Sequence, residues 1–299
     1  MPAPISPLNQ DQIDAILDGE GHESCPGVVL RSDVEIRPAT AEAPRQYAAI
    51  YEPEARVAAL SPGLLVFHGG GFNGGNPHGP GALAKMLALT LGVVTVSASY
   101  RTGTAEKPTG PAILDDAANA WAWVHAHAAD LGIDPLRIAV GGHSAGVLLG
   151  GHLAVRSPLV TAAQGISELP APAAFYACWG PVDFVARWYD NGENPGAEVN
   201  ILGPGGFPAH PSGYHQLSVL AHARGALPPA LFIYGRTDTV VHPRQGALGT
   251  AAWLASGSFA ESFTLPNIGH AIVGDNRDQR RQYLEKSVKF ASWRHLGPS

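Results

Sequence analysis

The sequence is poor in cysteine and in charge, and it has no long run of basic side chains. Its 299 residues include two cysteines, Cys25 and Cys178, too few for a disulfide framework, although one bridge between them is compatible with the sequence. This scarcity favours a reducing compartment, so we expect a cytoplasmic protein. The formal net charge is -6, and the longest basic run is Arg280-Arg281. These features argue against binding to nucleic acid or to an anionic membrane surface.

Long hydrophobic runs are missing too. No apolar stretch approaches the roughly 18 residues that a membrane-spanning helix needs. The amino-terminal stretch MPAPISPLNQDQIDAILDGEG has no basic segment followed by an apolar core, so we expect no signal peptide.

What the sequence does contain is enough apolar residues for a large core. Hydrophobic residues make up 45% of the chain and charged residues 15%, which suits one large α/β domain or two small ones. Two early segments alternate like half-buried strands in a hairpin at a sheet edge: VVLRSDVEIRP from Val28 and RQYAAIYEP from Arg45. Continuous apolar runs, typical of buried parallel strands, then follow: GLLVFH from Gly63, VVTVSASY from Val93, RIAVGG from Arg137, AAFYACW from Ala173 and ALFIYG from Ala230.

Helical patterns accompany these runs. They cover residues 8–17, 81–92, 112–132, 243–256 and 278–296. The alternation predicts one doubly wound α/β domain over residues 1–299, with helices on both faces of the sheet. Residues 183–224 are the irregular part, with NGENPG and LGPGGFPAHPSGYH, and predict a small cap or lid inserted over the sheet.

The stretch RIAVGGHSAG predicts a sharp turn at a serine. The motif GHSAG, Gly142 to Gly146, follows a buried strand and opens a helix, the setting of a nucleophile elbow. Such a turn holds Ser144 in a strained conformation, and glycines two residues away on each side relieve the crowding. The N–H of Ala145, at the start of the helix, would point toward an oxyanion beside the serine. An ordinary glycine-rich turn is the alternative.

A second glycine-rich stretch strengthens this interpretation. VFHGGGFNGG begins at the end of a buried strand, and its consecutive glycines let backbone N–H groups approach a substrate oxygen. Gly70 and Gly71 are the expected donors. For His68 we expect a structural role, with the imidazole bound to loop backbone, rather than direct chemistry.

A base and an acid follow in the order that this kind of site requires. His270 lies in a loop after the last strand pattern, ESFTLP, at the same sheet edge as Ser144. It would accept the serine proton and later return it to the leaving group. Asp238 follows the strand ALFIYG and can orient the imidazole, and Asp183, which also follows a strand, is the competitor.

These stretches resemble the hormone-sensitive-lipase-like carboxylesterases of the α/β-hydrolase superfamily, from about Gly63 to the end of the chain. The matching motifs are HGGGF at 68–72, SYR at 99–101, LGIDPLRIAVGGHSAG at 131–146, GRTD at 235–238 and GHAI at 269–272. The resemblance implies an eight-stranded, mostly parallel sheet with a Ser-Asp-His triad and a three-donor oxyanion hole. Carried over by position, it assigns the triad to Ser144, Asp238 and His270 and the donors to Gly70, Gly71 and Ala145.

The elbow departs from the usual family pattern. Members often read GDSAGG, whereas here His143 replaces the acid and Val147 follows the second glycine. This is closer to bacterial xylan-side-chain esterases and arylformamidases, so the subfamily and the substrate stay open.

Five side chains are candidates for the substrate pocket, and packing in the core is an equal alternative for the aromatic ones after residue 178. They are Phe72, His143, Trp179, Phe184 and Trp188. No HExxH motif occurs, and His125 and His127 do not share a helical face, so we expect no metal and no cofactor.

The sequence therefore predicts a serine esterase acting on small-molecule esters, with a preference for short acyl chains. Cleavage of an activated amide, such as an N-formyl group, by the same triad is one alternative. Another alternative is a noncatalytic ligand-binding protein built on a hydrolase scaffold, since gibberellin receptors resemble this fold. This alternative predicts that a triad member is missing, whereas all three are present here. The sequence does not indicate an oligomeric state.

Overall fold

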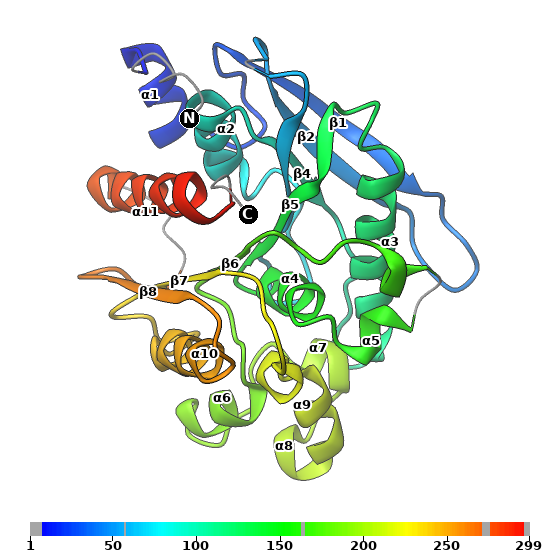
Figure 1. The fold of residues 1–299 in the computed structure, drawn as a ribbon. Coiled ribbons are helices and arrows are strands. Elements are labelled where there is room, and N and C mark those ends of the chain that lie inside the picture. The colour runs from blue at the N-terminus through cyan, green and yellow to red at the C-terminus, as the bar shows by residue number, and fades with distance from the viewer. Residues whose placement is uncertain (1–7, 57, 163–164, 271–275, 296–299) are drawn as a thin grey trace.

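One eight-stranded sheet lies at the centre of the computed structural model (Figure 1). The structure describes residues 8–56, 58–162, 165–270 and 276–295. Its order is β1-β2-β4-β3-β5-β6-β7-β8. The strands are β1 (Val28–Arg37), β2 (Gln46–Pro53), β3 (Ser61–Phe67), β4 (Val94–Ala98), β5 (Ile133–His143), β6 (Phe175–Cys178), β7 (Ala230–Gly235) and β8 (Ala260–Leu265). β2 pairs antiparallel with β1 and β4, and all other neighbours are parallel. The edge hairpin and the mostly parallel sheet are thus confirmed, but β2 is buried almost throughout rather than half-buried, because it lies between β1 and β4.

Helices cover both faces of the sheet, as predicted (Figure 1). One face carries α1 (Gln10–Leu17), α2 (Gly81–Leu91) and α11 (Arg277–Phe290), and the other carries α3 (Ile113–Ala126), α4 (Gly146–Ala154), α5 (Pro158–Thr161) and α10 (Arg244–Ala255). Because both faces are covered, every residue of β3, β4, β6 and β7 is buried, which explains their unbroken apolar runs. Shorter turns lie at Gly110–Ala112 (η1), Ile166–Glu168 (η2) and Ala291–His295 (η4).

Glycine lets α4 pack tightly on the strand that precedes it. A Cβ at Gly150 would lie 2.6 Å from the carbonyl oxygen of Gly141 in β5, so no larger residue fits there without a shift. The close contact fixes the start of α4 at the carboxyl end of β5, where Ser144 stands.

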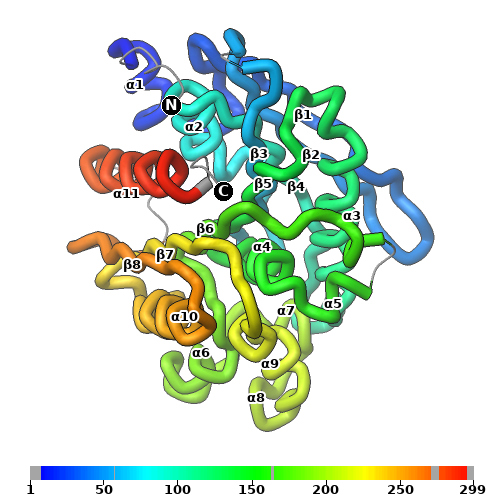
Figure 2. The backbone as a smooth tube through the Cα atoms, viewed as in Figure 1, coloured from blue at the N-terminus to red at the C-terminus, as the bar shows by residue number. Residues whose placement is uncertain are grey.

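The irregular stretch between β6 and β7 forms a group of short helices. These are α6 (Phe184–Asp190), α7 (Val199–Leu202), α8 (Gly206–Ala209), α9 (Pro211–Leu217) and the turn η3 (Val219–His222). The tube in Figure 2 follows them together at one end of the molecule, below α4 and beside α10. The side chain of Gln245 in α10 accepts hydrogen bonds from the backbone N–H groups of Val182 and Asp183, both 2.9 Å long, and so ties this group to the main fold.

Two general predictions can be compared with this fold. Cys25 and Cys178 are both buried and free, so no bridge joins them. None of the helices in the described part of the chain combines the length and the apolar composition needed to cross a bilayer.

Candidate active site

Ser144 stands at the tip of the turn between β5 and α4. Its φ is 49°, in the left-handed region that a residue with a side chain seldom adopts, and its N–H donates to the carbonyl of Cys178 over 2.8 Å. A Cβ at Gly142 would lie 2.1 Å from the backbone of Gly146, and one at Gly146 would lie 2.2 Å from the Phe67 carbonyl oxygen. The turn therefore excludes side chains at both glycines, as the motif predicts.

A chain of hydrogen bonds runs from the serine through the imidazole to a carboxylate. The Oγ of Ser144 lies 2.8 Å from Nε2 of His270, and Nδ1 of His270 lies 2.8 Å from Oδ2 of Asp238. The neutral tautomer with its proton on Nδ1 satisfies both bonds, because Nδ1 donates to the carboxylate and Nε2 accepts from the hydroxyl. The structure thus brings together the three residues predicted to act as nucleophile, base and acid. Ala271 and Ile272, the end of the GHAI motif, lie outside the described residues.

The carboxylate of Asp238 is held rigidly. Its side chain is fully buried, and Oδ1 accepts from the backbone N–H groups of Val240 and Val241, both over 2.8 Å. Oδ2 is then left to accept from His270. Fixing the carboxylate in this way also fixes the imidazole orientation.

Asp183, the competing acid, has a different task. Its Oδ1 accepts from the N–H of Ala186 at 3.0 Å and caps the first turn of α6. Asp238, and not Asp183, is the carboxylate bonded to His270.

Three backbone N–H groups are free beside the serine. Within the described residues, no acceptor is bonded to the N–H of Gly70, Gly71 or Ala145. All three residues line one cavity together with Ser144 and His270. A Cβ at Gly70, where φ is 129°, would lie 2.2 Å from the Gly74 carbonyl oxygen, so the loop requires glycine there. This geometry suits a hole for a developing oxyanion.

His68 holds the backbone of the glycine loop in place, which is the structural role expected for it. Its Nδ1 bonds the Gly69 carbonyl over 2.6 Å, and its ring stacks on Tyr100 with 4.4 Å between centroids. The Tyr100 hydroxyl donates to the His68 carbonyl. Burial lowers the pKa of His68 to about 4, so the imidazole is neutral at pH 7 and unsuited to proton transfer there.

The same loop has two further supports that sequence reasoning missed. The side-chain amide of Asn200, from the short-helix group, donates to the Gly71 carbonyl over 2.8 Å. The N–H of Gly103 donates to the Phe72 carbonyl, and the neighbouring Arg101 is held by the buried carboxylate of Asp116 through three hydrogen bonds. Nothing local in the sequence marks Asn200, because its partner lies 129 residues away.

The cavity beside Ser144, hereafter the nucleophile cavity, has a volume of about 220 Å³. Its lining is largely apolar and consists of Gly70, Gly71, Phe72, Ser144, Ala145, Pro181, Arg187, Ala197, Val240, Val241 and His270. Phe72 therefore lines it as predicted, and Arg187 is a lining residue that sequence reasoning missed.

The other four predicted pocket residues do not line this cavity. Trp179, Phe184 and Trp188 are buried in the hydrophobic core, at 4%, 0% and 6% exposure. Their aromatic character reflects packing: Trp188 meets Tyr214 edge to face, and Phe184 packs near Phe72. His143 is buried as well.

His143 instead joins the elbow to the last helix. Its Nε2 lies 2.8 Å from the hydroxyl of Tyr283 in α11, and its ring packs on Trp179 with 4.7 Å between centroids. Burial, and to a smaller extent the charge of His68, lowers the pKa of His143 to about 3. The neutral imidazole thus serves as a buried bridge that anchors the residue just before the nucleophile.

Removing the Tyr283 hydroxyl is expected to destabilise the fold. In Tyr283→Phe the buried Nε2 of His143 loses its partner, so the free energy of unfolding should fall by about 1–3 kcal/mol in urea denaturation. Tyr189→Phe is the matched control, because Tyr189 is 56% exposed and its loss should cost less than about 0.5 kcal/mol. Equal stability of Tyr283→Phe and wild type would refute the role given to this bridge.

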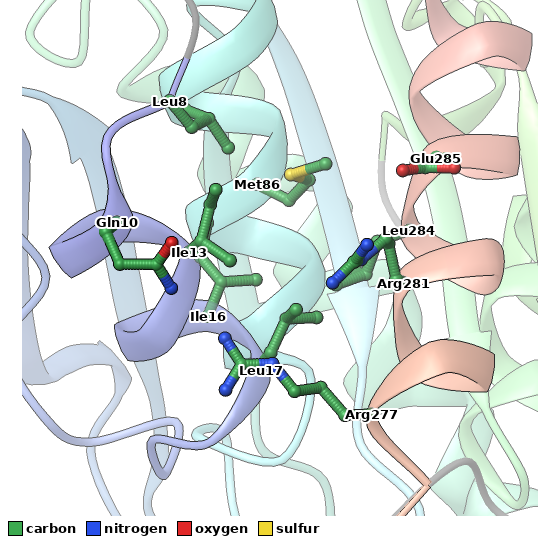
Figure 3. A pocket seen from close by; sticks show the side chains of 10 residues that line it. All are labelled: Leu8, Gln10, Ile13, Ile16, Leu17, Met86, Arg277, Arg281, Leu284 and Glu285. Carbon is green, nitrogen blue, oxygen red and sulfur yellow. The ribbon is translucent and has the colours of Figure 1, made fainter.

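A second cavity, of about 360 Å³, lies between α1, α2 and α11 (Figure 3). Leu8, Ile13, Ile16, Leu17, Met86 and Leu284 point into it, and the charged side chains of Arg277, Arg281 and Glu285, all from α11, also line it, with that of Arg277 reaching across to α1. Arg277 is paired with Asp14 and Asp18. No serine, cysteine or histidine is among the described residues that line it, so these residues offer no nucleophile and base.

Comparison with known proteins finds ester hydrolases among the proteins similar to this chain. A family model described as α/β hydrolase fold matches residues 64–199. The chain is 31% identical over 169 residues to the carboxylic ester hydrolase LipN of Mycobacterium tuberculosis, covering 55% of this chain and 42% of LipN. It is 38% identical over 124 residues to ethyl acetate hydrolase of Pseudomonas putida, covering 41% of this chain and 36% of that protein. The chain thus spans less than half the length of these relatives.

Solved structures share the whole architecture. A bacterial heroin esterase superposes with a TM-score of 0.73 at 22% identity, covering 97% of this chain and 94% of that one. A truncated carbohydrate esterase from gut microbiota gives 0.72 at 19% identity, covering 90% and 96%. At such identities the likeness concerns the fold. Together with the family model and the curated relatives, it shows that the chain has the α/β-hydrolase fold and is similar to carboxylic ester hydrolases.

Proposed function

We propose that this protein is a serine carboxylesterase that hydrolyses short-chain carboxylic esters through an acyl-enzyme intermediate. The observation that carries the proposal is the hydrogen-bonded chain from Ser144 through His270 to Asp238, beside three free N–H groups. The curated relatives named as ester hydrolases support it.

The reaction follows from the geometry in two halves. Nε2 of His270 takes the proton of Ser144 as Oγ attacks the ester carbonyl, and Asp238 stabilises the imidazolium that forms. The N–H groups of Gly70, Gly71 and Ala145 donate to the oxyanion. His270 then protonates the departing alcohol, and water, activated by the same imidazole, releases the carboxylic acid. Only residues of this chain take part in these steps, so the proposal needs no cofactor.

The preference for short acyl chains rests on the size of the nucleophile cavity. Its 220 Å³ is below the roughly 300–1,000 Å³ of pockets that enclose drug-sized ligands. We further propose that residues 183–224 act as a small lid within a single domain, because Ala197 and Arg187 from this stretch contribute to the lining. The expectation of a cytoplasmic location stays a prediction.

A series of p-nitrophenyl esters tests both parts of the proposal. We expect the acetate and butyrate to be hydrolysed with kcat/KM at least about tenfold above that of the octanoate, because a longer chain cannot be enclosed without displacing lining residues. The measurement is the initial rate of p-nitrophenolate release, with each ester kept below its critical micelle concentration.

Two outcomes would contradict the proposal. Faster turnover of the octanoate would refute the short-chain preference. Failure to hydrolyse any of these esters, together with hydrolysis of the matched p-nitroanilides or N-formyl anilines, would assign the same triad to amides.

A further inference from the structure

A polar cavity adjoins the nucleophile cavity. It has a volume of about 510 Å³ and is lined by Arg187, Asp190, Asn191, Asn194, Pro195, Gly196, Ala197, Thr239 and Val240. Arg187, Ala197 and Val240 line both cavities. Arg187 therefore stands at the boundary between the space beside Ser144 and a region of amide, hydroxyl and carboxylate groups.

The guanidinium of Arg187 is fixed at this boundary by two of its three nitrogens. Nε donates to the carboxylate of Glu198 over 3.1 Å, and Nη1 donates to the carbonyl of Val240. Arg187 is 5% exposed and Glu198 1%, and Glu198 also receives the hydroxyl of Tyr214 at 3.4 Å. Such a buried, doubly held guanidinium has little freedom to reorient.

The third nitrogen, Nη2, has its bonding capacity unused. No acceptor among the described residues bonds it, and it is not one of the polar atoms sealed from solvent without a partner. Because Arg187 lines both cavities and is 5% exposed, Nη2 is the guanidinium nitrogen left to a ligand at their boundary. A cationic donor kept without a protein partner in a cavity is a binding group for an oxygen acceptor.

Gly196 leaves the room that this arrangement needs. A Cβ there would lie 2.5 Å from Nη2 of Arg187 and 2.8 Å from Oε2 of Glu198. Any other residue at this position would push the guanidinium and its partner aside, although the backbone of Gly196 has no conformation that requires glycine.

The charges at the boundary point to an uncharged ligand. Arg187 is balanced by Glu198, and Asp190 in the polar cavity is balanced by Arg244 at 2.8 Å. An additional charge on the substrate would have no opposite charge left to pair with and would be desolvated at a cost. A neutral ether, hydroxyl or carbonyl oxygen meets no such penalty and still accepts from Nη2.

We propose that Arg187 is a specificity-determining residue that binds an uncharged oxygen in the alcohol portion of the ester. The apolar lining of Phe72, Pro181 and Val241 belongs to the nucleophile cavity alone and suits the acyl group. The polar cavity then receives the alcohol portion, so the substrates are short-chain esters of neutral, oxygen-bearing alcohols. This proposal rests on the proposed esterase function and narrows its substrate class.

Two acetate esters that differ only by an ether oxygen in place of a methylene group test whether Arg187 binds an oxygen of the alcohol portion. In 2-methoxyethyl acetate an ether oxygen replaces one methylene of butyl acetate, and acetic acid release gives kcat/KM for each. The ether preference is the kcat/KM for 2-methoxyethyl acetate divided by that for butyl acetate. We expect this ratio to fall at least about tenfold in the double variant Arg187→Met/Glu198→Gln. This variant removes both charges together, and the hydrogen bond from Tyr214 can persist. Gly196→Ala should lower the ratio in the same direction, because it displaces the guanidinium without removing its charge.

The ratio separates a loss of oxygen recognition by Arg187 from a loss of active enzyme and from differences in ester reactivity. It is independent of the fraction of active enzyme, and comparison with wild type cancels the different reactivities of the two alcohols. Arg45→Met, which removes an exposed arginine of the β1–β2 hairpin, should leave the ratio unchanged. An unchanged ratio in both site variants, with p-nitrophenyl acetate still hydrolysed, would overturn the role of Arg187 alone. Absence of hydrolysis of every ester by wild type would instead overturn the proposed function.

Discussion

Replacing Ser144 with alanine is expected to lower kcat/KM for p-nitrophenyl acetate by at least about a thousandfold. The hydroxyl is the group that would become covalently bonded, and among the described residues no other serine is bonded to His270. Residual turnover would come from the oxyanion donors and from His270 acting on water. Stopped-flow or steady-state measurement of p-nitrophenolate release gives the loss in kcat/KM.

Folding does not confuse this comparison. Alanine lacks only the Oγ atom, and it would occupy the same left-handed conformation, φ 49°, that serine already tolerates. The melting temperature of Ser144→Ala should therefore stay close to that of wild type. Ser292→Ala, which removes an exposed serine hydroxyl of the carboxyl-terminal turn, is the matched control and should keep full activity. Equal rates in wild type and Ser144→Ala would remove Ser144 from the mechanism.

The second large effect is expected for Asp238→Asn, with a loss in kcat of roughly a thousandfold or more. The reason lies in the two backbone N–H groups of Val240 and Val241, which both donate to Oδ1. In asparagine the carbonyl oxygen must occupy that position, so the NH₂ group faces Nδ1 of His270. The imidazole then carries its proton on Nε2 and cannot accept one from Ser144.

Asp183→Asn provides a stringent control for this prediction. Asparagine caps helices about as well as aspartate, so α6 should keep its first turn, and Asp183 is not bonded to His270. We expect its kcat on p-nitrophenyl acetate to stay within about twofold of wild type. Comparable losses in both variants would show that the orienting acid has been misassigned.

Much of the fold was predictable because local patterns dictate it. The apolar runs of β3, β4, β6 and β7 reflect burial on both sides. The patterns of β1 and β2 predicted the hairpin at the sheet edge, but not that β2, which lies between β1 and β4, is buried almost throughout. The turn at Ser144 was predictable for a similar reason, since steric exclusion of side chains demands glycine at fixed positions.

Features that depend on distant segments were not predictable. Asn200 supports Gly71 across 129 residues, and Arg187 reaches the cavity from the irregular stretch, where no periodic pattern fixes the direction of a side chain. The aromatic residues after β6 were partly misjudged for the same reason. An aromatic side chain fits a pocket wall and a core equally well, and the packing that buries Trp179 decides between them.

The central claim, that Ser144 is the nucleophile activated by His270, is tested most directly by covalent trapping. With paraoxon, Oγ should attack phosphorus and expel p-nitrophenolate, leaving one diethylphosphoryl group per chain. Mass spectrometry after trypsin should locate it on the peptide of residues 138–156, at Ser144, and Ser144→Ala should stay unlabelled. A group on another residue, or a wild type that remains unlabelled while still hydrolysing p-nitrophenyl acetate, would contradict the account.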